Sequence, residues 1–199
     1  MPQFIQPFID AGAGAKIAAR GTARVGAAFD AAGVARADLE LADAALESGN
    51  HALQGIQATI PWRRDAKEAA QADFRAAGGK FGALALGAFS LPVAMRGYEF
   101  DLPRAEIPLL DGKLLFEDFH AARSGNAWQW RLGAALEPVS MPALSQALGW
   151  PKMAGVLSAA IPRISYANAT LALDGQLMVA VFDGYLAVDG LKLIEPFGA

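Results

Sequence analysis

The sequence of 199 residues lacks cysteine and has only two histidines. Without cysteine, the chain can form neither a disulfide nor a thiolate metal site. Charged residues make up 19% of the sequence, the formal net charge is −3, and no run of Lys or Arg occurs. The cationic surface that nucleic-acid binding requires is therefore missing, and we expect no nucleic-acid partner.

Long apolar runs are also missing. The best one, residues 82–95, carries Pro92 and is shorter than the roughly 18 residues of a membrane-spanning helix. The first residues do not open a signal peptide, because no cationic start precedes an apolar segment. We expect that any anchor or export signal lies outside this sequence.

Residue patterns for catalysis are scarce. Ser124, His120 and Asp118 could in principle form a triad, but residues so close in one strand or turn alternate in direction, and no nucleophile elbow is present. The carboxylate pair Glu117-Asp118 lacks a convergent third ligand for a metal ion. We expect no enzyme activity, no cofactor and no metal.

Alternating apolar residues, by contrast, run through most of the chain. Leu171 and Leu173, for example, alternate with Ala172 and Asp174, and this period of two is typical of a strand with one buried face. Many of the apolar residues are alanine, which makes up much of the 54% hydrophobic content. The pattern predicts a meander of antiparallel strands.

Asp-Gly pairs mark the expected turns near the C-terminus, at residues 174–175, 183–184 and 189–190. The third pair follows the second too closely for a full strand. We therefore expect hairpin turns at the first pair and at one of the other two, and a glycine bulge inside a longer strand at the remaining one. Residues 107–116 predict a hairpin with its turn at Asp111-Gly112.

Other segments are read as follows. Residues 2–14 predict a helical turn or an irregular lead-in, and Arg20-Gly21-Thr22 predicts a weak hairpin turn. Residues 63–79 have the composition of a helix but also alternate, and we favour a strand for their second half. Residues 141–149 predict one short helix, with Pro142 in its first turn and Gly149 at its end.

A series of short motifs resembles the C-terminal part of YdbH-like proteins, which belong to the AsmA-like bridge-type lipid-transfer proteins of Gram-negative bacteria. The resemblance covers residues 105–199 and depends on the order of the motifs. They are Leu109-Leu-Asp-Gly-Lys-Leu114, Leu136-Glu-Pro-Val-Ser-Met141, Ala147-Leu-Gly-Trp-Pro151, Gly155-Val-Leu-Ser158, Ile161-Pro162, Asp174-Gly-Gln-Leu177, Val181-Phe-Asp-Gly184 and Glu195-Pro-Phe-Gly198.

This resemblance implies a mainly β fold: a long, strongly curved antiparallel sheet, a taco-like β-groove, with one or two short helices. It implies a periplasmic location, an inner-membrane anchor outside this chain, outer-membrane partners, and transport of phospholipid acyl chains along the apolar face. We expect residues 1–199 to be a single segment of such a groove and a fragment of a longer protein.

Alternation places one set of apolar side chains together on the face expected to line the groove, with Arg36, Asp38, Glu40, Gln129 and Arg131 on the face toward water. The alternative is a structural or interaction module in which the same apolar face is the dry core of a β-sandwich that binds no ligand. The thirteen groove candidates are Leu39, Leu41, Ile56, Ile60, Trp128, Trp130, Leu132, Leu136, Leu171, Leu173, Leu177, Val179 and Val181.

Overall fold

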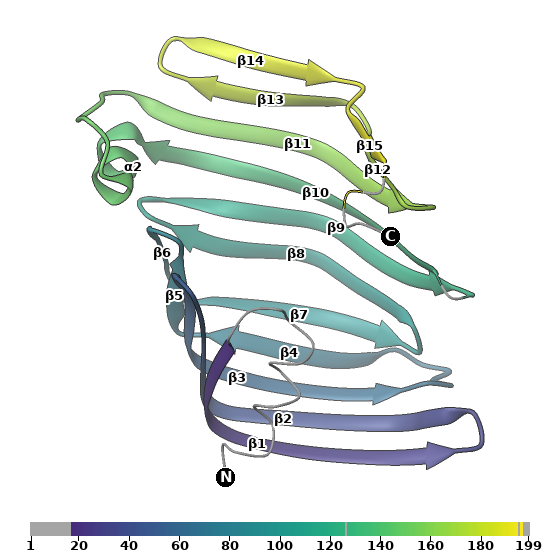
Figure 1. Ribbon diagram of the computed structural model, residues 1–199. Helices are drawn as coiled ribbons and strands as arrows, with labels where there is room; N and C mark the ends of the chain where they lie inside the picture. Colours follow the sequence, from purple (N-terminus) through teal and green to yellow (C-terminus); the bar gives the residue numbers. More distant parts are fainter. Residues whose placement is uncertain (1–16, 126, 195, 197–199) are drawn as a thin grey trace.

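The computed structural model describes residues 17–125, 127–194 and 196. These residues form one antiparallel sheet of 15 strands and one short helix (Figure 1). The predicted fold class, a long curved antiparallel sheet, is confirmed. The predicted lead-in at residues 2–14 lies outside the described residues.

The strands follow one another along the chain with a single helical interruption. Their bounds are β1 Ile17–Asp30, β2 Gly33–Ser48, β3 His51–Arg63, β4 Ala70–Ala76, β5 Gly78–Phe81, β6 Leu84–Leu86, β7 Phe89–Arg96, β8 Glu99–Leu109, β9 Gly112–Ser124, β10 Ala127–Ser140, α2 Met141–Leu148, β11 Val156–Ala167, β12 Thr170–Leu173, β13 Gln176–Val181, β14 Gly184–Asp189 and β15 Lys192–Ile194.

Several of the short strands are halves of longer bent strands. β4 and β5 both pair with β3, and β12 and β13 both pair with β11. β6 and β7 likewise pair with β5 and β4, and both of them pair with β8. The sheet is therefore a simple meander of long strands, each of which continues across a bend.

A row of irregular positions, which we call the crease, causes the bend at the N-terminal end of the sheet. Register shifts occur at Arg20/Thr22 between β1 and β2 and at Leu41/Ala44 between β2 and β3. In β3, Gly55 has φ +58°, and a Cβ there would lie 2.7 Å from the Cβ of Ala77. Such bulges bend and twist strands locally, so the aligned row folds the ends of β1 to β3 upward.

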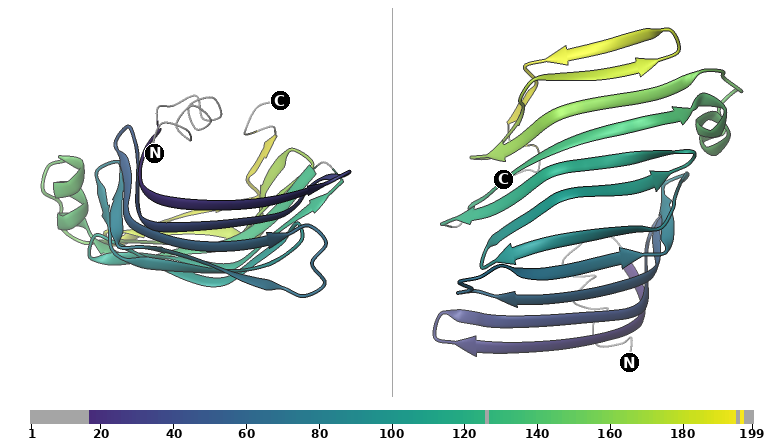
Figure 2. Two further views of the ribbon diagram at one scale, coloured as in Figure 1. Left: turned by 90° about the horizontal axis from the view of Figure 1, so that it is seen from below. Right: turned by 180° about the vertical axis from the view of Figure 1, so that it is seen from behind.

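A second line of irregularities crosses the C-terminal half. The register shifts between Arg131 and Gly133 toward β9, and between Leu132 and Ala134 toward β11. The line continues through Asp174-Gly175, which interrupts the long strand formed by β12 and β13. With both lines bent to the same side, the sheet becomes a trough (Figure 2).

The described residues form no second sheet against this trough, and the core is correspondingly small. Its largest fully buried side chains are Ile56, Val139 and Ser145. One buried cluster, Ala44, Ile56 and Ala76, lies along the crease, with four half-buried neighbours packed on it. Burial is thus divided between the crease and the junction of β10 with α2, where Val139 and Ser145 lie.

Helix α2 confirms the predicted helix at residues 141–149. The Ser140 hydroxyl accepts a hydrogen bond from the Ala143 amide at 3.2 Å, and Gly149 ends the helix with φ +68°. The Ser140 amide donates to the Asp111 carboxylate at 3.0 Å, and the hydrogen bonds from Ser140 lower the pKa of Asp111. The helix is thereby tied to the β8–β9 turn.

Three turn predictions need correction. No hairpin forms at residues 20–22, because β1 runs through them with a register shift. Asp174-Gly175 is a break within a long strand, since the strands on both sides of it pair with β11. The β8–β9 turn lies at residues 110–111, one position before the predicted one, because Leu109 pairs with Gly112.

The remaining local predictions are confirmed. The turn at the second Asp-Gly pair joins β13 to β14, where Val181 pairs with Gly184. Asp189-Gly190 is the break inside the strand formed by β14 and β15. Of residues 63–79, the second half is strand, as β4 shows.

Candidate apolar trough

The inner face of the trough, here called the trough face, is built by cross-strand pairs of apolar residues. In an antiparallel sheet, directly opposed residues point to the same side. In the N-terminal half, Leu39 opposes Ile60, and Leu41 opposes Ala58. Ile56 follows on the same side, two residues before Ala58.

The C-terminal candidates form a similar ladder. Trp130, Leu132 and Leu136 of β10 oppose Tyr166, Ile164 and Ala159 of β11. The next strands continue the pairing from β11: Leu171 and Leu173 oppose Tyr166 and Ile164, and Val179 and Val181 oppose Ala159 and Leu157. Leu177 and Trp128 share these faces by alternation with Val179 and Trp130.

The two ladders belong to one face. From Ala58 the pairing passes to Phe74 and on to Leu91, which lies on the same side of β7 as Met95. Met95 opposes Phe100, Phe100 opposes Ala121, and Ala121 opposes Trp130. All thirteen groove candidates therefore lie on the trough face.

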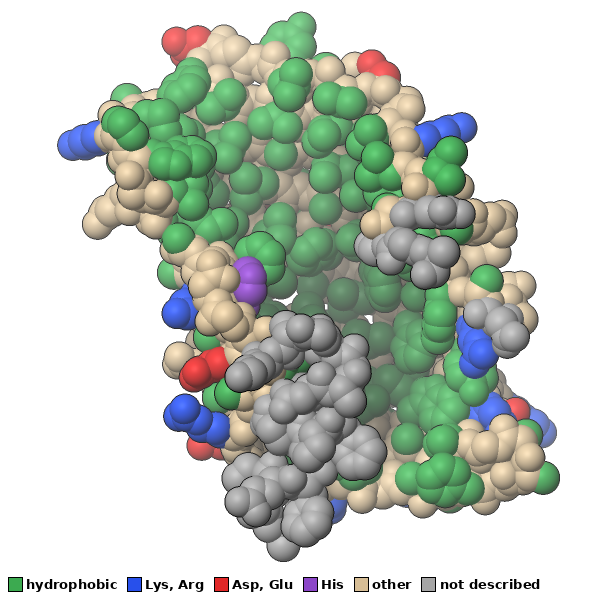
Figure 3. All heavy atoms as spheres, viewed as in Figure 1, with side chains coloured by type: hydrophobic (Ala, Val, Ile, Leu, Met, Phe, Trp, Pro, Cys, Tyr) green, Lys and Arg blue, Asp and Glu red, His purple; other side chains and the backbone are tan. Residues whose placement is uncertain are grey.

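Exposure of these thirteen side chains is intermediate in most cases. Ile56 is 0% exposed, because it lies in the crease cluster, whereas Trp128 is 41% exposed. The other eleven are half-buried. Hydrophobic side chains fill the floor of the hollow face, and charged ones lie at its margins (Figure 3).

Aromatic residues that we did not single out from the sequence also line the trough face. Tyr98 and Phe100 have ring centroids 6.4 and 5.8 Å from that of Trp128, and Tyr166 stacks on Trp130 at 5.8 Å. For Tyr98 and Phe100 the signal was their alternation with Glu99 and Asp101, which predicts a strand with both rings on one face. They were not included among the groove candidates.

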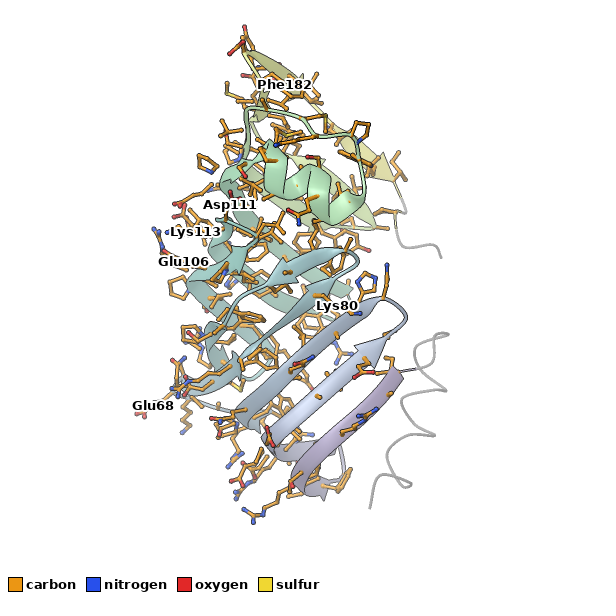
Figure 4. All side chains as sticks on the ribbon, turned by 90° about the vertical axis from the view of Figure 1, so that its left-hand side faces the viewer. Glu68, Lys80, Glu106, Asp111, Lys113 and Phe182 are labelled. Carbon is orange, nitrogen blue, oxygen red and sulfur yellow. The ribbon has the colours of Figure 1, made fainter. Side chains whose placement is uncertain are left out.

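The outer, convex face carries the charges. The five residues predicted to face water all lie on this side, because each alternates with an apolar neighbour on the trough face; they are Arg36, Asp38, Glu40, Gln129 and Arg131. The guanidinium of Arg63 donates a hydrogen bond to the Asp38 carboxylate at 2.8 Å. Farther along, Glu106 pairs with Arg104 at 2.8 Å and with Lys113 at 3.0 Å. These two cations lower the pKa of Glu106, Arg104 being the larger cause. Figure 4 shows Glu106 and Lys113 together on the side away from the trough opening.

The bent ends of β1, β2 and β3, together with β5 and β6, form the upturned wall of the trough. A distinct corner hollow of about 390 Å³ lies where this wall meets the floor of the trough. Its apolar lining consists of Ile17, Leu46, Leu53, Phe81, Leu86 and Phe89, together with Ala52. The His51 ring lies against Phe81, with centroids 4.4 Å apart, and its Nδ1 accepts a hydrogen bond from the Gly82 amide at 3.1 Å. None of these residues was a groove candidate from the sequence.

Comparisons with protein-family models, curated proteins and solved structures found no match. The resemblance of residues 105–199 to YdbH-like proteins stays a prediction. In the described part of the chain, no helix is long and apolar enough to cross a membrane.

Polar residues with catalytic potential do not converge among the described residues. His120 pairs with Asp101 at 2.7 Å on the convex face, rather than with Asp118 and Ser124. Within the same residues, no three His, Asp or Glu side chains gather as metal ligands. The chemistry that the arrangement offers is apolar contact on one face and charge on the other.

Proposed function

We propose that this chain is a segment of an intermembrane phospholipid-transport bridge, whose trough face conducts acyl chains across the periplasm. The observation that carries the proposal is the continuity of the trough face: apolar side chains follow one another from β2 to β13, and most of the large ones are half-buried, whereas Ile56 and Met95 are buried. The inner-membrane anchor and the outer-membrane partners come from the resemblance alone.

The proposed mechanism is passive. Each methylene of an acyl chain that leaves water gains roughly 0.8 kcal/mol, so the trough face holds a chain without any specific polar contact. Successive positions offer similar apolar surroundings, and a chain therefore moves between them at little cost. No catalytic step and no cofactor is part of the mechanism.

The alternative, a structural module with a dry β-sandwich core, requires the trough face to be covered by large packed side chains. Among the described residues the fully buried large side chains are few, and eleven of the thirteen groove candidates are half-buried. This exposure favours a surface that takes up an apolar ligand. We therefore prefer the transport proposal.

Photocrosslinking from adjacent positions tests the proposal. A benzoyl-phenylalanine residue is placed at Leu132 or Leu39 on the trough face, and at the neighbouring Arg131 or Glu40 on the convex face as matched controls. The experiment uses cells that produce the protein and contain radiolabelled phospholipid. We expect adducts from the trough positions Leu132 and Leu39, and likewise from Leu173 and Val179, but none from Arg131 or Glu40. Adducts from Arg131, Glu40, Arg36 or Gln129 but not from the trough positions would reject the proposal, as would their absence everywhere.

A further inference from the structure

The corner hollow differs from the rest of the trough face in its floor. Leu53 and Phe89 line the hollow and also pack on the buried cluster of Ala44, Ile56 and Ala76. Among the described residues, this is the cluster in which buried hydrophobic side chains contact one another, and it lies at the crease. The hollow is therefore preformed on this side, because Leu53 and Phe89 are held by packed neighbours.

The hollow also has the size and lining of a ligand site. Small-molecule sites usually measure about 300 to 1,000 Å³ and have mostly apolar walls, and the hollow of about 390 Å³ falls within that range. Ser48 and His51 supply its polar border. Glu47 and Lys80 also line the hollow, but both oppose Ala52, and their side chains therefore point to the other side from Leu53. Figure 4 shows Lys80 on the upturned wall.

We propose that the corner hollow is a fixed binding site for a single acyl chain, set apart from the open surface along which chains slide. This inference rests on the proposed function and adds a resting position to it. The site recognises the hydrocarbon tail, because its walls are apolar and its one well-placed ring nitrogen, Nδ1 of His51, already accepts a hydrogen bond. A phospholipid or a free fatty acid could supply the tail.

Binding of the fluorescent fatty acid cis-parinaric acid to the purified chain tests the site. In Leu46→Trp the added ring fills the hollow, and we expect binding to weaken about tenfold or more because an overfilled cavity excludes the ligand. The matched control is Glu40→Trp, which should bind the probe like the wild type. Glu40 opposes Thr59 on the convex face, its side chain is 53% exposed, and it lies outside the hollow. Equal binding by wild type and Leu46→Trp, or no binding by wild type, would overturn the proposal.

A second measurement covers the case in which Leu46→Trp does not fold. Palmitic acid carrying a diazirine group is crosslinked to the wild-type chain, and the labelled peptides are identified by mass spectrometry. Labels concentrated in residues 46–53 and 81–89 support the site, whereas labels spread evenly over the strands overturn it. Displacement of the probe by palmitic acid or by phosphatidylglycerol vesicles then shows which source of the tail is bound.

The two proposals fail in different ways. If probe binding is lost in Leu46→Trp while Leu132 still crosslinks to phospholipid in cells, both proposals stand. If the probe binds in the hollow but Leu132 gives no adduct, transport is rejected and the site remains. If Leu132 crosslinks but the probe binds Leu46→Trp normally, only the corner site is rejected.

Discussion

Apolar residues on the trough face have different roles, which depend on how deeply each side chain is buried. Ile56 and Leu39 are both aliphatic and both point into the trough. Ile56 is 0% exposed, since Ala44 and Ala76 close over it at the crease, whereas Leu39 is half-buried in the open sheet. The first contributes to stability, and the second is available to a ligand.

Truncation of these two side chains should therefore have unequal effects on the free energy of unfolding. We expect Ile56→Ala to cost about 2 to 5 kcal/mol, because the methyl groups it removes leave a cavity in a packed cluster. Leu39→Ala should cost clearly less, because its side chain is already partly in water. Urea unfolding followed by circular dichroism measures both, and similar losses would contradict the distinction.

At the scale of the element, the crease shapes the wall of the trough. It combines register shifts in β1 and β2 with a left-handed glycine, Gly55, in β3. The bend requires Gly55 for two reasons: its φ of +58° is unfavourable for other residues, and a Cβ would meet the Cβ of Ala77 at 2.7 Å. Gly49 has the same φ of +58°, but a Cβ added there would have no atom within 4 Å, so only the first reason applies to it.

The pair Gly55→Ala and Gly49→Ala separates the two reasons. Both substitutions place alanine in the left-handed region, which costs roughly 1 to 2 kcal/mol. We expect Gly55→Ala to lower the free energy of unfolding further, because it also forces β3 away from Ala77. Equal losses in denaturant unfolding would show that the crease yields freely and does not hold the wall in place.

These elements also show how far sequence reasoning reached. Alternation predicted which side chains point the same way within each strand, because direction along a regular strand depends on the local backbone alone; the pairing register joins these sets into one face. Asp174-Gly175 was wrongly taken as a turn, because the same dipeptide suits a hairpin and a bulge. The outcome depends on whether β11 continues alongside, which is a long-range property.

At the scale of the whole molecule, one apolar face and one charged face are kept apart over the length of the sheet. The convex ion pairs, such as Arg104 with Glu106, leave the trough face to apolar side chains. Under the transport proposal, a charge introduced into the trough would have to be desolvated when an acyl chain passes.

We accordingly expect Leu132→Asp combined with Leu173→Asp to block lipid passage. These half-buried positions both oppose Ile164, so the two carboxylates would lie in one segment of the trough. Phospholipid crosslinking from Val179 should fall about tenfold or more, because an acyl chain avoids an unpaired charge. The control is Arg131→Asp on the convex face, which should crosslink normally. Undiminished crosslinking in the double variant would contradict passage along this route.

The sequence by itself determined the fold class, the position of the helix and the membership of the trough face, because periodicity, capping residues and alternation are local properties of the chain. The tertiary structure alone decided which way the sheet curves, which Asp-Gly pair turns the chain, and where the corner hollow lies. These features depend on the alignment of bulges in neighbouring strands. Gly55 and Ala77 meet only when β3 pairs with β4 and β5.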